Sequence, residues 1–273
     1  MRTSLYVTIL ILSLSACDQD TADNNEHKPV PHRPPAETTT PDTNLSVPDN
    51  RNSSNYRVLL FGNSHTVKLA GLIRTLISNG NPEASIEVEN AGGGFLVDNL
   101  NSPSQVAKLE EGSWTHVILQ GQKYSQSDAR IYPTIAAQLW IEKTKKKEAT
   151  PILFPEHPQK GNTEEGMRVH LIHTAIAELQ KSCVAPIGLT WNKVLNTSPP
   201  LTLHHSDGNH AAYTGSLLTA LVFYEVITGS SADLLPYIPK IDVDEDTQQL
   251  LGQMASETIQ ANQPCKYEEG SRS

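Results

Sequence analysis

Two short runs, far apart in the chain, hold the residue types that nucleophilic catalysis needs. Gly62-Asn63-Ser64 ends one apolar run, and Asp207-Gly208-Asn209-His210 precedes another. A serine hydroxyl attacks well only when a base takes its proton, and an imidazole base needs a carboxylate to fix its tautomer. We therefore predict Ser64 as nucleophile, His210 as general base and acid, and Asp207 as the carboxylate that orients it. The alternative is that Ser64 and Asp207 only cap helices.

Strands that alternate with helices must position these residues. Short β-type runs predict strands at 56–61, 86–89, 116–119, 151–154 and about 185–189. Apolar residues at helical spacing over 69–77 predict a first helix, and others are expected at roughly 128–148, 163–182, 210–228 and 244–262. Such alternation predicts an α/β fold: a flavodoxin-like, doubly wound, mostly parallel five-stranded sheet with helices on both faces. Ligands bind such sheets beyond the carboxyl ends of the strands, where Ser64 follows the first strand.

Together the two runs resemble the conserved blocks of the SGNH hydrolases, also called the GDSL family. The first block of that family matches Gly62-Asn63-Ser64, and its last block, an Asp three residues before a His, matches Asp207 and His210. The resemblance covers about residues 56–230. It implies the SGNH hydrolase fold and an ester hydrolase without a cofactor, in which the Ser attacks an acyl carbonyl.

The resemblance also implies an oxyanion hole. One donor would be the backbone N–H of Ser64, and a second would be the N–H of a glycine after the second strand, with Gly94 first and Gly93 second. The family usually has an Asn after the third strand, but here Gln120 and Gln122 stand there. That departure is similar to sialate-acetylesterase-like members, in which a Gln amide donates. We expect Gln120 to be the third donor, with Gln122 as the alternative.

Further polar and aromatic residues follow the later strands. Glu156 and His157 come after the fourth strand, so they either line the substrate cleft or belong to a solvated loop. Trp191 comes after the fifth strand and either floors a sugar subsite or packs in the core. The expected partner is a small acylated substrate, an O-acetylated glycan by resemblance to carbohydrate acetyl esterases.

A metal-dependent hydrolase and a non-catalytic binding protein on the same scaffold are the rival interpretations. The candidate metal ligands are His204, His205, Asp207 and His210, joined by Glu156 and His157. Adjacent histidines would point apart in an extended chain, and a metal site leaves Ser64 without a role. We therefore expect no metal.

The first residues predict export and lipidation. Arg2 precedes an apolar run over 5–14 that is too short to span a bilayer, and Leu14-Ser15-Ala16-Cys17 follows. This run is similar to the bacterial lipobox, which implies a lipoprotein signal peptide over 1–17 and a membrane anchor on acylated Cys17. The alternative is an ordinary signal peptide with a chance cysteine. We expect a cell-envelope location, with Asp18 favouring the periplasmic face of the inner membrane over the outer membrane.

Composition completes the domain plan. Residues 18–55 are rich in Pro, Thr and Asn and predict a disordered tether, followed by a catalytic domain at 56–262 and a flexible tail at 263–273. Cys183 and Cys265 are an even pair in a chain expected to be exported, so they are a candidate disulfide. The formal net charge of -9, with scattered Lys and Arg, argues against a nucleic-acid partner.

Overall fold

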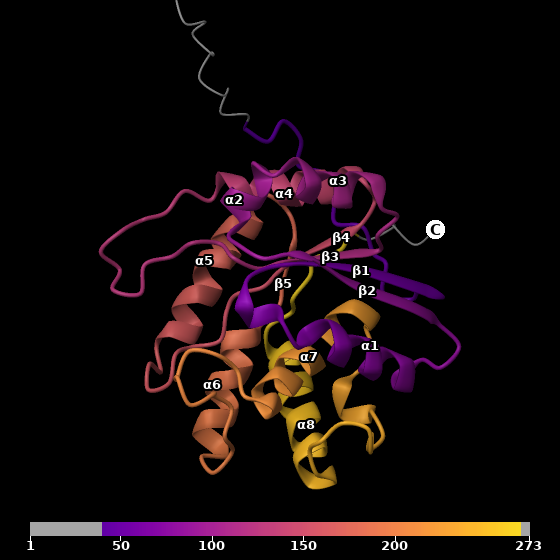
Figure 1. Ribbon diagram of the computed structural model, residues 1–273, viewed down its shortest axis with the longest axis vertical. Coiled ribbons are helices and arrows are strands. Elements are labelled where there is room, and N and C mark those ends of the chain that lie inside the picture. Colours follow the sequence, from indigo (N-terminus) through magenta and orange to yellow (C-terminus); the bar gives the residue numbers. More distant parts are fainter. Residues whose placement is uncertain (1–39, 269–273) are drawn as a thin grey trace, which may run out of the picture. The chain divides into compact units, whose positions relative to one another are not determined.

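The computed structural model describes residues 40–268, whose strands form one five-stranded parallel sheet (Figure 1). The strands are β1 (Asn55–Phe61), β2 (Ser85–Gly92), β3 (His116–Leu119), β4 (Thr150–Leu153) and β5 (Cys183–Val184). Their order is β2-β1-β3-β4-β5, and each neighbouring pair is parallel. This is the flavodoxin-like order, so the predicted fold class is confirmed.

Helices cover both faces of the sheet (Figure 1). One layer consists of α1 (Leu69–Gly80), α6 (Ile187–Thr197), α7 (Tyr213–Thr228) and α8 (Glu245–Ala261). The other consists of α2 (Leu96–Leu100), α3 (Pro103–Glu111), α4 (Ile135–Lys146) and α5 (Glu165–Leu179). Two short 3-10 turns, η1 (Ser64–Thr66) and η2 (Ala232–Leu234), complete the elements of the described part.

Strand β1 shows why these residues form a central strand. Val58 and Leu60 pack with the α1 layer, whereas Leu59 and Phe61 pack with the α4 layer. A strand of a covered parallel sheet is apolar on both faces, and the continuous apolar sequence meets that requirement. The polar sequence that follows β1 therefore emerges at the carboxyl edge of the sheet.

The predicted fifth strand at 185–189 is wrong. Strand β5 is Cys183–Val184, and helix α6 already begins at Ile187. Pro186 separates the two elements, because its ring lacks a backbone N–H for a sheet ladder and its fixed φ suits a helix start.

The predicted helix at 128–148 begins later, at Ile135. Asp128 has a φ of +57°, a left-handed conformation that an α-helix does not accept, and Pro133 precedes the first helical turn. Residues 120–134 therefore form a long irregular segment, which we call the 120–134 loop. Helices α2, α3 and α6 were not predicted.

The packed domain begins before residue 56, which corrects the predicted tether at 18–55. Residues 42–50, here called the N-terminal strap, lie across the amino ends of the strands. The carboxylate of Glu142 accepts hydrogen bonds from the backbone N–H of Thr43 (2.9 Å) and Asp42 (3.2 Å). Val47 is buried, and the hydroxyl of Thr150, the first residue of β4, donates to the carbonyl of Pro48 (2.6 Å). Residues 18–39 lie outside the described residues.

The predicted flexible tail at 263–273 also needs correction, because the chain packs as far as Tyr267. The N–H of Val184 in β5 donates to the carbonyl of Pro264 (2.7 Å). Cys183 and Cys265 form a disulfide with their Cα atoms 4.3 Å apart. The guanidinium of Arg51 lies 4.2 Å from the centre of the Tyr267 ring. Residues 269–273 lie outside the described residues.

Between residues 40 and 268, none of the helices has the length and apolar character needed to cross a bilayer. The predicted signal peptide, the lipidation site Cys17 and the sorting residue Asp18 all lie outside the described residues.

Candidate active site

The structure brings Ser64, His210 and Asp207 into one hydrogen-bonded line at the carboxyl edge of the sheet. The imidazole Nε2 of His210 lies 2.8 Å from Ser64 Oγ, and its Nδ1 lies 2.8 Å from Asp207 Oδ2. Because an ionised carboxylate only accepts, Nδ1 carries the proton and Nε2 accepts from the serine hydroxyl. This is the geometry that a general base needs to take the serine proton.

Ser64 is the first residue of η1, in the tight turn that follows β1; we call residues 62–66 the Ser64 turn. The side-chain oxygen of Asn63 accepts from the N–H of His65 (3.1 Å), and the carbonyl of Asn63 accepts from the N–H of Thr66 (3.1 Å). Asn63 therefore caps the turn, so the capping alternative for Ser64 is not what the structure has. The serine hydroxyl is left to contact His210.

Asp207 holds its loop and orients His210 at the same time. Its Oδ1 accepts from the backbone N–H groups of Asn209 (2.8 Å) and His210 (2.9 Å), while Oδ2 faces the imidazole. The backbone and side-chain hydrogen bonds from His210, followed by the backbone bond from Asn209, hold the pKa of Asp207 well below its usual range. Helix α7 begins at Tyr213 with Ala212 at its N-cap, so Asp207 does not cap that helix.

The glycine run after β2 lies beside the Ser64 turn. Strand β2 pairs with β1 up to the partners Phe61 and Gly92, and a Cβ on Gly93 would lie 3.9 Å from the carbonyl oxygen of Gly62 in the Ser64 turn. Gly94 has a φ of +117°, a conformation that side chains rarely adopt, and a Cβ there would lie 3.1 Å from the amide oxygen of Asn99. Gly94, or Gly93 as the alternative, therefore stays our candidate for the second oxyanion donor.

Gln120 does not stand as an oxyanion donor, which corrects the prediction. Its side chain is 0% exposed, its Oε1 accepts from the N–H of Asn63 (2.7 Å), and its Nε2 donates to Glu156. The alternative, Gln122, donates through Nε2 to the carbonyls of Lys123 (2.8 Å) and Pro133 (3.2 Å). Both side-chain amides are hydrogen-bonded to backbone or carboxylate groups of the protein, and neither is presented to a substrate.

The candidate metal ligands have separate partners. His204 Nε2 pairs with the carbonyl of Pro158 (2.8 Å), and His157 Nε2 pairs with the carbonyl of Asn209 (3.0 Å). Within residues 40–268, no group of three or more His, Cys, Asp or Glu side chains is arranged to hold a metal ion.

Trp191 lies in the core and does not floor a subsite. Its side chain is fully buried, and its indole N–H donates to the hydroxyl of Thr219 in α7 (3.0 Å). The structure therefore supports the core alternative for Trp191 and not the sugar subsite.

Sequence reasoning missed His65, although it stands directly after Ser64. Its ring stacks on that of His210, with centroids 5.2 Å apart and planes 25° from parallel, and its Nε2 lies 3.7 Å from Glu156 Oε2. Burial, and then the neighbouring His210, lowers the pKa of His65 to about 4. Burial raises the pKa of Glu156 to about 7. The only sequence signal was the Ser-His adjacency at the strand end.

A cleft of about 740 Å³ opens beside the Ser64 turn. Its lining includes Asn63, His65 and Asn209, which are neighbours of the triad residues, together with Glu156 and parts of the 120–134 loop. From that loop come Lys123, Tyr124 and Tyr132, and Phe95 faces them. Arg168 holds the loop by donating to Asp128 (3.0 Å) and to the carbonyl of Gln126 (2.9 Å).

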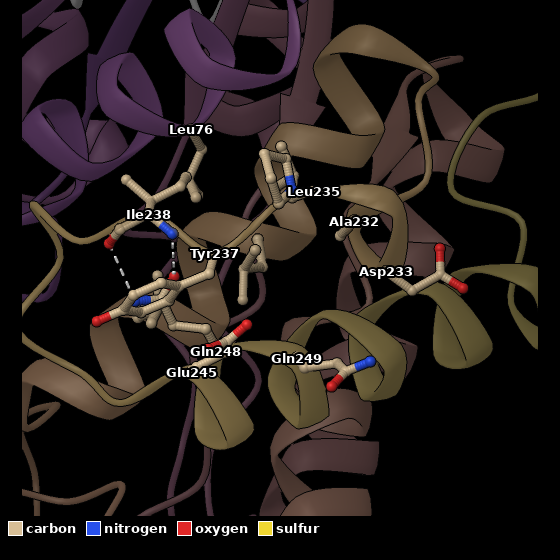
Figure 2. Close-up of a pocket in the computed structure, with 12 residues that line it drawn as sticks. Leu76, Ala232, Asp233, Leu235, Tyr237, Ile238, Glu245, Gln248 and Gln249 are labelled. Atoms are coloured by element: carbon tan, nitrogen blue, oxygen red, sulfur yellow. Dashed lines mark hydrogen bonds between the residues drawn. The ribbon is translucent and has the colours of Figure 1, made fainter.

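A smaller cavity of about 150 Å³ lies away from the triad, among α1, α7, η2 and α8 (Figure 2). Gln248 crosses it and bonds both backbone groups of Ile238, each at 3.1 Å (Figure 2). Leu76 and Leu217 supply apolar walls. Because the Gln248 amide is hydrogen-bonded to backbone groups and not free to bind a ligand, we regard this cavity as a packing feature.

The parallel sheet order and the position of Ser64 at the end of β1 define the class: the chain has the fold of the SGNH hydrolases. Among similar solved structures is a protein from Slackia heliotrinireducens assigned to the SGNH hydrolases, with 21% identity and a TM-score of 0.51, covering 63% of this chain and 98% of that chain. A DUF4886 family protein from Bacteroides uniformis has 13% identity and a TM-score of 0.58, covering 78% and 98%.

A third similar structure is a catalytic mutant of an acetylxylan esterase from Geobacillus stearothermophilus, with 19% identity and a TM-score of 0.51, covering 66% of this chain and 96% of that chain. The chain matches no protein-family model and no curated protein. The predicted SGNH hydrolase fold is confirmed by these similarities.

Proposed function

We propose that this protein is a serine ester hydrolase that removes O-acetyl groups from carbohydrates. The single observation that carries the proposal is the unbroken line from Ser64 Oγ through the His210 imidazole to the Asp207 carboxylate, with 2.8 Å at each step. Such a line turns a serine hydroxyl into a nucleophile at neutral pH.

In the acylation step, His210 Nε2 takes the Ser64 proton while Ser64 Oγ attacks the acetyl carbonyl carbon. The carbonyl oxygen becomes negative and receives hydrogen bonds from the backbone N–H groups of Ser64 and Gly94. Each such donor is typically worth about 10²–10³ in rate. The ester C–O bond then breaks, His210 gives its proton to the leaving alcohol, and the acetyl group stays on Ser64.

In the deacylation step, His210 takes a proton from a water molecule, and the hydroxide attacks the acetyl carbonyl. The bond to Ser64 Oγ breaks, the serine recovers the proton, and acetate leaves. Asp207 stabilises the charged imidazole in both steps, because its hydrogen bonds keep it ionised.

The cleft beside the Ser64 turn supports a carbohydrate as the alcohol half of the ester. Its lining mixes hydroxyl, amide and aromatic groups, as in Tyr132, Gln126 and Phe95. Sugars offer hydroxyl groups for hydrogen bonding and apolar faces for aromatic rings, so a mixed lining suits them. The acetylxylan esterase with the same fold is described as acting on an acetylated polysaccharide.

The first test is acetate release by the purified protein from p-nitrophenyl acetate and from acetylated xylo-oligosaccharides, with and without a chelator. Chelator-insensitive turnover that disappears in Ser64→Ala supports the serine hydrolase. Chelator-sensitive turnover would favour the metal-dependent alternative, and no turnover of any acyl ester would favour the binding protein. A kcat/KM that is higher for p-nitrophenyl octanoate than for the oligosaccharides would count against the carbohydrate substrate.

A second proposal concerns Cys17, which we propose is lipidated and holds the protein in the cell envelope. It is supported by the apolar run that ends in Leu14-Ser15-Ala16-Cys17. Mass spectrometry of the mature N-terminus is the test, with Cys17→Ser as the matched variant. An unmodified Cys17, or cleavage at another position, would overturn it.

A further inference from the structure

One buried carboxylate is linked to both sequence neighbours of the nucleophile. Glu156 accepts from the Gln120 amide, whose oxygen accepts in turn from the backbone N–H of Asn63 (2.7 Å). On the other side, Glu156 Oε2 lies 3.7 Å from Nε2 of His65. The backbone N–H of Asn63, before Ser64, is therefore linked to Glu156 by hydrogen bonds through Gln120. The ring of His65, after Ser64, lies near the same carboxylate, which is itself only 13% exposed.

The His65 ring passes this restraint on to the catalytic imidazole. It stacks on the His210 ring at 5.2 Å and meets the His157 ring edge-on at 5.1 Å. Its Nδ1 is buried without a hydrogen-bond partner among the described residues. A buried bare acceptor costs less than a buried unpaired N–H, so the ring proton belongs on Nε2, facing Glu156. In this tautomer the ring N–H points toward Glu156 while the ring face packs against His210.

We propose that Glu156 is a positioning residue that acts through Gln120 and His65 to hold the Ser64 turn and the back of the His210 ring. The inference rests on the proposed serine hydrolase activity. We call these three residues the Glu156 brace. It replaces the oxyanion role that the sequence suggested for Gln120.

The charge on Glu156 gives the brace a pH dependence. The groups that face this carboxyl are His65 from η1, Gln120 after β3, Tyr124 from the 120–134 loop and Glu165 from α5. Burial raises the pKa of Glu156 to about 7, Glu165 adds to the rise, and hydrogen bonds from Gln120 and Tyr124 oppose it. Above neutral pH the ionised carboxylate favours the imidazolium that forms at His210 during the reaction, and below it the neutral acid does not.

The test is Glu156→Gln, which keeps the shape of the side chain but cannot ionise. We expect kcat for p-nitrophenyl acetate to fall about tenfold with KM within about twofold, a loss smaller than the ~10²-fold that a 1 Å misplacement can cause. We also expect the wild-type pH profile of kcat/KM to contain a step near pH 7 that the variant lacks. The matched control is Glu142→Gln, a buried carboxylate that holds the N-terminal strap at the opposite edge. It should lower the melting temperature and leave kcat and the pH profile unchanged.

A covalent probe separates failure of the brace from failure of the proposed function. A fluorophosphonate reacts with an activated serine without needing an acetyl substrate, so its labelling rate measures the nucleophilicity of Ser64. Wild-type labelling without acetyl-ester turnover would sink the proposed substrate, and slower labelling of Glu156→Gln would still support the brace. No labelling of the wild type would sink both.

A second variant covers the case in which Glu156→Gln does not fold. His65→Gln keeps a polar group near Glu156 but removes the ring from the back of His210, and it should lower kcat with little change in KM. If a folded Glu156→Gln or His65→Gln keeps the wild-type labelling rate and the wild-type pH profile, the brace is wrong.

Discussion

The imidazole of His157 lies flat against the indole of Trp191, with ring centroids 4.0 Å apart and planes 13° from parallel. The His157 ring also reaches the candidate site, because its Nε2 pairs with the carbonyl of Asn209, the residue before His210. The indole is anchored in turn by the hydroxyl of Thr219 in α7. The stack therefore connects the core between α6 and α7 to the loop that carries Asp207 and His210.

Trp191→Phe should weaken both stability and catalysis. It removes the indole N–H, leaves Thr219 without that donor and reduces the ring area under His157. We expect a loss of about 1–3 kcal/mol in the free energy of unfolding, measured with denaturant, and a fall in kcat. Trp114→Phe is the matched control, since that indole donates to the carbonyl of Lys108 (2.7 Å) near the amino end of β3. An equal effect of both variants on kcat would show that the stack has no special role.

Asp207→Asn should remove most activity while keeping the loop. An Asn oxygen can still accept from the N–H groups of Asn209 and His210, but its NH₂ would face His210 Nδ1 and favour the wrong tautomer. We expect kcat/KM for p-nitrophenyl acetate to fall about 10⁴-fold.

Ser64→Ala should lower kcat about 10⁴–10⁶-fold. Folding should be unchanged, because the Ser64 hydroxyl is exposed and its hydrogen bond is to His210. Retention of more than a few per cent of activity in Ser64→Ala would point to another nucleophile.

Gln120→Ala should cost stability as well as rate, which distinguishes a brace from an oxyanion donor. The change leaves the N–H of Asn63 and the Glu156 carboxyl without their partner, and each unpaired buried group costs about 1–3 kcal/mol. A pure oxyanion donor would lower kcat about 10²–10³-fold with little effect on unfolding. Chemical denaturation and steady-state kinetics on the same variant decide between the two roles.

The folded state should lose stability in acid. Burial lowers the pKa values of His116 and His157 to about 3 and that of His173 to about 4. Below the ordinary His pKa of 6.5, these histidines bind protons in the unfolded chain but stay neutral in the folded chain. The free energy of unfolding therefore falls as pH drops from 6.5 toward 3. The raised pKa of Glu156 has the opposite effect on stability. Its contribution is fully present below pH 4.5, the ordinary pKa of Glu, and is lost as pH rises through about 7. Melting temperature against pH is the measurement, and His116→Asn should flatten its acid side.

The disulfide should contribute to stability and little to catalysis. Cys183 and Cys265 are 82 residues apart, and closing a loop of that length is worth about 2–5 kcal/mol. Cys183 is the first residue of β5, an outer strand that β3 and β4 separate from β1, the strand that leads to Ser64. Cys183→Ala with Cys265→Ala should therefore lower the denaturant midpoint and leave kcat unchanged below the melting temperature. A variant as stable as the wild type would argue against the bond.

The triad residues could be predicted from sequence because each of the two short runs that carry them is recognisable by itself, although Ser64 and His210 are 146 residues apart. Asp207 and His210 are three residues apart, and the backbone N–H groups that hold Asp207 belong to the same loop. Ser64 follows a strand whose apolar run is unmistakable. The strand order could be predicted as well, because alternating strands and helices leave few arrangements.

The Glu156 brace and the N-terminal strap could not be predicted, because their partners are distant in the chain. Gln120 meets Glu156 across 36 residues, and Thr43 meets Glu142 across 99. Residues 42–50 are mostly polar, and their composition gives no sign that the Glu142 carboxylate and the Lys145 ammonium form hydrogen bonds with their backbone. These residues are held mainly by hydrogen bonds to distant side chains, whereas sequence patterns detect the burial of apolar residues.

The N-terminal strap enters at the amino ends of the strands, whereas Ser64 and His210 lie beyond the carboxyl ends. A bead, sensor chip or fusion partner joined directly at residue 40 would therefore attach to the side of the domain opposite Ser64. Immobilisation at that residue would leave Ser64 facing the solution. A surface coated with the domain in this way would present Ser64 directly to an insoluble polymer, which cannot diffuse to a buried site.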